Sequence, residues 1–112
     1  MIDRPTFDEL KNMMGVDFVS ELIDTYNQET GQLIEQLQQA LISGDSATFG
    51  RLAHSIKSSS ASLGALDFSQ QARELEMLGK ANNLTEAGPK LQVLSTDFLQ
   101  VVRNLEELKN EP

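Results

Sequence analysis

Apolar residues recur every three or four positions along most of the chain, which is the spacing of residues on one face of an α-helix. The clearest run lies near the C-terminus, where gaps of three and four alternate through Leu91, Leu94, Phe98, Val101, Leu105 and Leu108. A run of this kind forms a heptad seam that packs against neighbouring helices at a shallow angle. Period-two runs of β-branched residues are missing, so the pattern predicts an all-α fold.

Five helices are predicted from these periodic segments and from the residues that interrupt them. They span about residues 6–13, 17–43, 45–63, 67–80 and 86–109. Thr6 and Glu9 fit a capping box at the start of the first, and Gly64 is placed to end the third. Four amphipathic helices with short connections predict an antiparallel up-and-down four-helix bundle with a short additional N-terminal helix. Residues 1–112 are expected to form a single domain.

Charge and composition narrow the range of partners. The chain carries a formal net charge of −8 and has no cysteine. An acidic chain without a basic stripe argues against nucleic acid and anionic membranes as partners. No apolar run approaches the length of a membrane span, and the first residues do not resemble a signal peptide. We therefore expect a cytoplasmic protein, and a self-contained bundle favours a monomer.

The only histidine, His54, lies in the small-residue stretch LAHSIKSSSASLGA. Each residue of an α-helix is rotated by about 100° from the one before it. On the third helix this rotation places His54 almost opposite the stripe that is expected to be buried. That stripe is formed by Phe49, Leu52, Ala53, Ile56, Ser60 and Leu63. His54 is therefore expected to point outward. One interpretation is that His54 is an ordinary solvated residue without a functional role. A metal site is disfavoured because no second His or Cys accompanies it, and a serine triad lacks an oxyanion element.

The expected neighbours of His54 on this outward face are small. Gly50 lies one turn before it and Ser58 one turn after it, with Lys57 and Ala61 alongside. Glycine and consecutive serines weaken a helix, and a plain bundle surface gains nothing from them. A surface that another molecule must approach closely does gain from small residues, so the pattern favours a docking site.

The segment HSIKSSSASLG, from His54 to Gly64, resembles the signature of histidine-containing phosphotransfer (HPt) domains. The family pattern is H-x-x-K-G-x-x-x-x-x-G on a long helix of a four-helix bundle. The likeness continues through LDFSQQARELEMLGK, which resembles the family helix beside the histidine helix. Motif-level likeness covers roughly residues 49–80. The chain departs from the family at Ser58, where the pattern has glycine, and this bears on transfer rate and partner choice.

The resemblance implies a role for each site residue. His54 would accept a phosphoryl group, because a neutral imidazole nitrogen is a good nucleophile. Lys57 would stabilise the phosphoryl charge. Glu76 would orient His54 by accepting the Nδ1–H. The remaining expected binding residues are Ser58, Gly50, Ala61 and Lys80, of which Lys80 would help to hold phosphate or partner.

The resemblance also implies the partners. They are receiver domains of response regulators, a hybrid histidine kinase, or both, and the Mg²⁺ belongs to the receiver. We expect no cofactor in this chain and no kinase or phosphatase activity of its own. Docking is expected on the exposed faces of the second and third helices, with Ile23 and Ala61 as an apolar rim. The alternative is a helical adaptor that binds signalling partners without phosphotransfer.

Overall fold

The computed structural model describes residues 1–111, and Pro112, the last residue of the predicted domain, lies outside them. The predicted all-α class is confirmed for these residues, which contain no strand. The elements are α1 (Arg4–Met14), α2 (Val16–Ser43), α3 (Ser46–Ser62), α4 (Leu66–Lys80), the 3-10 turn η1 (Leu84–Glu86) and α5 (Ala87–Lys109).

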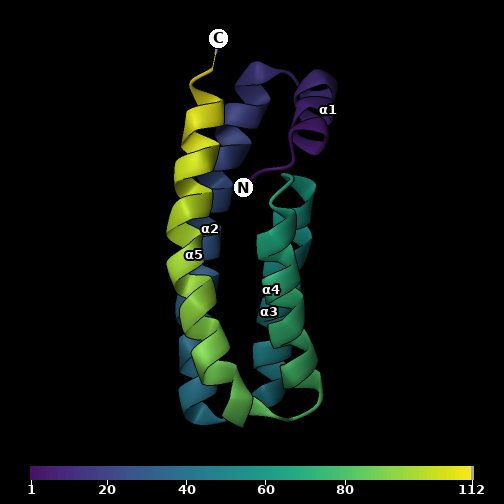
Figure 1. Cartoon of the computed structure of the whole chain (residues 1–112). Coiled ribbons are helices and arrows are strands. Elements are labelled where there is room, and N and C mark those ends of the chain that lie inside the picture. The colour runs from purple at the N-terminus through teal and green to yellow at the C-terminus, as the bar shows by residue number, and fades with distance from the viewer. Residues whose placement is uncertain (112) are drawn as a thin grey trace.

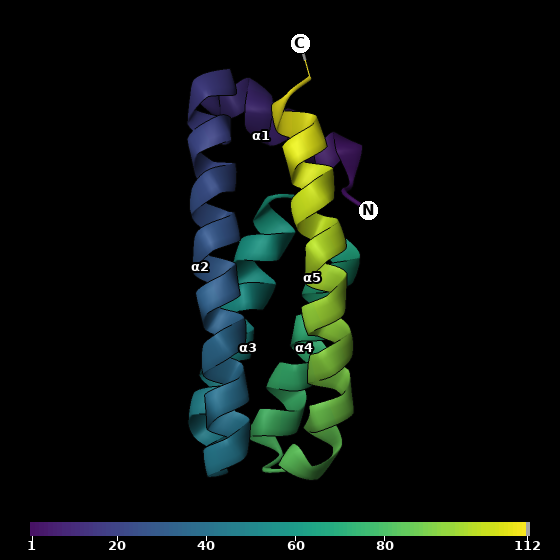
Figure 2. The same cartoon turned by 90° about the vertical axis from the view of Figure 1, so that its left-hand side faces the viewer.

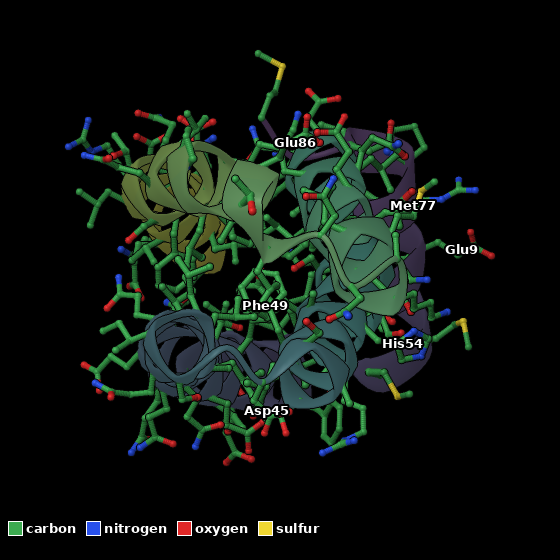
Figure 3. All side chains as sticks on the ribbon, turned by 90° about the horizontal axis from the view of Figure 1, so that it is seen from below. Glu9, Asp45, Phe49, His54, Met77 and Glu86 are labelled. Atoms are coloured by element: carbon green, nitrogen blue, oxygen red, sulfur yellow. The ribbon has the colours of Figure 1, made fainter. Side chains whose placement is uncertain are left out.

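The four long helices lie lengthwise beside one another, and α1 covers one end (Figures 1 and 2). The helices α2, α3, α4 and α5 form a ring in which each contacts the next, and α3 packs most extensively on α4. Seen along the axis, they surround a core into which Phe49 points (Figure 3). The molecule is elongated, with principal extents of 45 × 19 × 18 Å.

The apolar stripes of the sequence form this core. In the predicted seam of α5, only Phe98 is partly exposed, and its ring lies 5.8 Å from that of Phe68 between centroids. The predicted stripe of α3 is also buried, apart from the half-buried Leu52. Its one hydroxyl, Ser60, forms a 2.7 Å hydrogen bond with Tyr26 of α2, so the buried polar group is satisfied.

Two helix starts differ from the prediction. The predicted capping box at Thr6 is wrong, because α1 begins earlier and Asp3 caps it by accepting the Thr6 N–H. Pro5 allows this early start, since the first turn of a helix needs no N–H donors. The helix α2 begins at Val16, before the predicted start at residue 17, and Asp17 lies in its first turn. The helix α3 begins at Ser46, and Asp45 caps it by accepting the Thr48 N–H.

We predict that Leu94→Ala lowers the free energy of unfolding by roughly 2–5 kcal/mol, the range for a leucine deleted from a packed core. Leu94 is fully buried on α5. The matched control on the same helix is Leu99→Ala, because Leu99 is 67% exposed; this change should stay within about 0.5 kcal/mol. Urea denaturation followed by circular dichroism measures both. Equal losses would contradict the assignment of the α5 seam to the core.

Candidate functional site

His54 lies on the outer side of α3 and points away from the core (Figure 3). More than half of its side chain is exposed, at 57%. The outward orientation predicted from the helical period is therefore confirmed. Its Nδ1 lies 2.7 Å from Oε2 of Glu76 on α4. An ionised carboxylate only accepts hydrogen bonds, so Nδ1 carries a proton, and in the neutral ring Nε2 keeps a free lone pair.

Glu76 is a buried carboxylate, only 4% exposed, on the α4 face that packs against α3. Its Oε1 accepts a 2.7 Å hydrogen bond from Nζ of Lys57, and Nζ of Lys80 lies 3.2 Å from its Oε2. Burial alone raises the pKa of Glu76, but the hydrogen bonds from Lys57, His54 and Lys80 outweigh it and bring the pKa down to about 2. Glu76 is therefore ionised at neutral pH and has a donor on each oxygen.

Two open hollows on the α3–α4 face flank this cluster. The first is lined by His54, Glu76 and Lys80 together with Ser46, Ala47, Gly50, Arg51, Ser55 and Gly79. The second is lined by Lys57, Ser58, Ala61, Ser69, Gln70 and Arg73. Every lysine and arginine of α3 and α4 lines one of them. The site is thus a basic patch on a strongly acidic chain.

Three serines of α3 turn their hydroxyl groups back onto their own helix. Ser59 Oγ donates to the carbonyl of Ser55 at 3.0 Å, and Ser62 Oγ donates to that of Ser58 at 3.1 Å. Ser55 does the same to the carbonyl of Arg51 at 3.3 Å. These bonds satisfy the hydroxyls locally, so α3 presents a low, smooth surface next to the histidine.

Two sequence-based placements are wrong. Gly50 was expected on the exposed face beside His54, but it is buried because the α4 backbone at Gly79 packs directly against it. Its backbone still lines the first hollow. Ile23 was expected in an apolar rim, but it is fully buried in the core. Its neighbour Leu22 is the partly exposed residue, and it lines a groove between α2 and α3.

The structure brings together the remaining predicted residues, although in two groups. Lys80 joins His54 and Glu76, while Ser58 and Ala61 lie with Lys57 in the second hollow. The sequence did not indicate Arg73 or Gly79. For Gly79 a signal existed: it stands three residues after Glu76, on the same helix face, where a helix otherwise disfavours glycine.

The comparisons identify the class of protein that carries this site. The family model described as "Hpt domain" matches residues 21–111. The match covers most of the chain, so the chain belongs to the Hpt domain family. The predicted function, histidine phosphotransfer in a phosphorelay, is thereby confirmed for the domain. Proteins of this family interact with receiver domains and histidine kinases.

One solved structure agrees with the fold over nearly the whole chain. It is histidine-containing phosphotransfer protein B (HptB) from Pseudomonas aeruginosa PAO1, with a TM-score of 0.91 and 23% sequence identity. The alignment covers 96% of this chain and 93% of that one. No curated protein matches this sequence.

Among residues 1–111, no helix is both long enough and apolar enough to cross a membrane. The same residues contain no group of three or more His, Cys, Asp or Glu side chains that could hold a metal ion.

The pKa of Glu76 predicts a pH dependence of stability. Because its pKa falls from 4.5 to about 2 on folding, the ionised carboxylate stabilises the folded state above about pH 4.5, and this contribution disappears as the pH falls toward 2. Wild type should therefore unfold at higher urea concentration than Glu76→Gln at pH 6, with a difference that shrinks between pH 4.5 and 2. Glu74→Gln, at a half-exposed carboxyl on the same helix, is the control. A difference independent of pH would contradict this assignment.

Proposed function

We propose that His54 is the phosphoacceptor and that it passes the phosphoryl group between the aspartates of two receiver domains, or from a histidine kinase to a receiver. One observation carries this assignment. The exposed His54 has its Nδ1 held at 2.7 Å by a buried carboxylate, with two lysines on that same carboxylate. This arrangement orients one ring nitrogen toward solvent and gathers positive charge where a phosphoryl group would arrive.

The transfer step requires neither water nor a nucleotide. The lone pair on Nε2 of His54 attacks the phosphorus of the aspartyl phosphate, an N–P bond forms, and the P–O bond to the partner's aspartate breaks. The aspartate leaves as a carboxylate with the electron pair. The imidazole keeps its Nδ1 proton and takes up positive charge, which the ionised Glu76 stabilises through their hydrogen bond. The onward transfer is the reverse step with a second aspartate.

The two lysines would then gain the phosphoryl group as a second partner. With phosphate absent, Lys57 and Lys80 both rest on Glu76. A phosphoryl group on Nε2 adds charge and three acceptor oxygens within reach of flexible ammonium groups. We expect each lysine to turn one of its three N–H groups toward it while another stays on Glu76, which therefore keeps a donor on each oxygen.

The surface around His54 suits a receiver domain, whose active site is acidic. Arg51 and Lys80 line one of the two hollows, and Lys57 and Arg73 line the other. Opposite charges steer such partners together and orient them. Contact area would come from the neighbouring α2–α3 groove, where the half-buried Leu22 takes the place expected for Ile23.

The remaining parts of the proposal concern the whole molecule. We describe the ring of α2 to α5 as an antiparallel up-and-down four-helix bundle, supported by the pairwise contacts of successive helices. We expect the protein to act as a monomer in the cytoplasm, where its receiver partners work. The Mg²⁺ that assists the transfer belongs to the receiver.

We predict that His54→Gln abolishes transfer of labelled phosphate from a phosphorylated receiver domain. Glutamine keeps polarity and similar bulk but has no nucleophilic nitrogen. On wild type the label should be acid-labile and alkali-stable, as expected for phosphohistidine. Because His54 is exposed, the variant should keep its helicity and bind the receiver nearly as well.

Two other outcomes would change the assignment. Normal labelling of His54→Gln would exclude His54 as the acceptor. If wild type took up no label from a panel of receivers that it still binds, the protein would instead be a helical adaptor. Circular dichroism and a binding titration on both proteins separate these cases from misfolding.

We predict that Ser58→Gly retains or improves the rate of transfer. Ser58 is exposed in the second hollow beside Lys57, and its carbonyl rather than its hydroxyl carries a hydrogen bond. Removing the side chain gives an incoming receiver more room at a cost in helix stability of about 0.5 kcal/mol. A large loss of transfer in this variant, with the fold intact, would instead show that the hydroxyl takes part in holding the phosphoryl group.

A further inference from the structure

Two glycines let the backbones of α3 and α4 touch. A Cβ atom added to Gly79 would lie 2.8 Å from both Cα and N of Gly50, and 3.0 Å from the carbonyl oxygen of Ser46. Carbon atoms in contact settle at about 3.5–4.0 Å, so an alanine at position 79 does not fit. The reverse does not hold. A Cβ added to Gly50 would find its nearest neighbours at 3.7 Å, an ordinary contact.

This contact lies one helical turn from the site. Gly50 precedes His54 by four residues on α3, and Gly79 follows Glu76 by three residues on α4. Residues at these spacings share a helix face. Because α3 and α4 run in opposite directions (Figure 1), both steps lead the same way along the pair. The backbone contact and the His54–Glu76 hydrogen bond are therefore neighbouring levels of one helix–helix interface.

We infer that Gly79 is a positioning residue, whose missing side chain sets the α3–α4 separation at which Glu76 reaches His54. The inference rests on the proposed role of His54 and adds how the geometry of the His54–Glu76 hydrogen bond is maintained. Packed helices ordinarily stand 8–10 Å apart according to the side chains between them, and glycine gives the close end of that range. The 2.7 Å bond to Nδ1 depends on that closeness.

The expected displacement is large compared with the tolerance of the bond. Moving a Cβ from 2.8 Å to an ordinary carbon contact separates the two backbones by about 1 Å at that level. N–H···O hydrogen bonds extend to about 3.2 Å, and a contact of about 3.6 Å is no longer one. Glu76 would then lose His54 while keeping Lys57 and Lys80, whose long side chains can follow it. The ring of His54 would be free to rotate and to change tautomer.

The test compares Gly79→Ala with wild type and with Glu76→Ala, in which the hydrogen bond is removed outright. Nitrogen chemical shifts of the His54 ring report which nitrogen carries the proton. We expect Gly79→Ala to remain helical, to lose the Nδ1–H preference as Glu76→Ala does, and to transfer phosphate roughly 10- to 100-fold more slowly. That is the range seen when a group orienting a metal-bound histidine is removed.

Two glycine variants serve as controls. Gly64→Ala is a destabilising control at the far end of α3: its φ is +89° and an added Cβ would lie 2.9 Å from the Asp3 carbonyl oxygen. It should lower stability but leave the His54 spectrum and the transfer rate unchanged. Gly50→Ala, where a Cβ fits, should also leave the spectrum unchanged. If Gly79→Ala does not fold, Gly50→Val presses on α4 from the opposite side and should give the same loss of the Nδ1–H signature.

A double variant distinguishes positioning from general damage. In a Glu76→Ala background, Gly79→Ala should slow transfer no further, because the bond it disturbs is already absent. A folded Gly79→Ala with the wild-type His54 spectrum would overturn the inference. It would also be overturned if Gly79→Ala slowed transfer in the Glu76→Ala background as much as it does in wild type. The ring spectrum is independent of transfer. If wild type proved unable to accept phosphate, the proposed function would fail while the spectrum still decided the role of Gly79.

Discussion

A single buried carboxylate is the constraint around which the site is organised. An ionised group without water needs a hydrogen-bond donor on each oxygen, or it destabilises the fold by several kcal/mol. Glu76 obtains its donors from Lys57, His54 and Lys80. Two of the three come from α3, so satisfying Glu76 requires α3 and α4 to stay close together. The same requirement fixes the orientation of the histidine, which links the stability of the helix pair to its reactivity.

The arrangement also explains how a strongly acidic chain can serve acidic partners. Its net charge of −8 opposes approach of an acidic receiver at long range. The bases of α3 and α4 are gathered in the two hollows, and the acid among them, Glu76, is buried. Attraction is therefore concentrated at the patch around His54. With the proposed role of His54, this charge distribution favours the orientation that places the partner's aspartate near the histidine.

Helical periodicity was enough to predict the helices, the seam of α5 and the outward direction of His54. It failed where the answer depended on a neighbouring helix. Gly50 falls on the outward side of α3 when that helix is considered alone, yet α4 covers it. Ile23 and Leu22 are adjacent in sequence, and only the packing around α2 decides which is buried. The three donors on Glu76 come from two helices, and one-dimensional spacing does not encode the distance between them.

The back-bonded serines of α3 have a consequence for the kinetics of encounter. Hydroxyl groups that already donate to their own helix have no donor left for surface water or for a partner. A partner that closes over these serines therefore meets few donors that need a new hydrogen bond. Dehydration then adds little to the barrier for association, and few specific bonds hold the complex together afterwards. Such an interface favours brief, repeated collisions, which suits a carrier that must release one partner before it can serve the next.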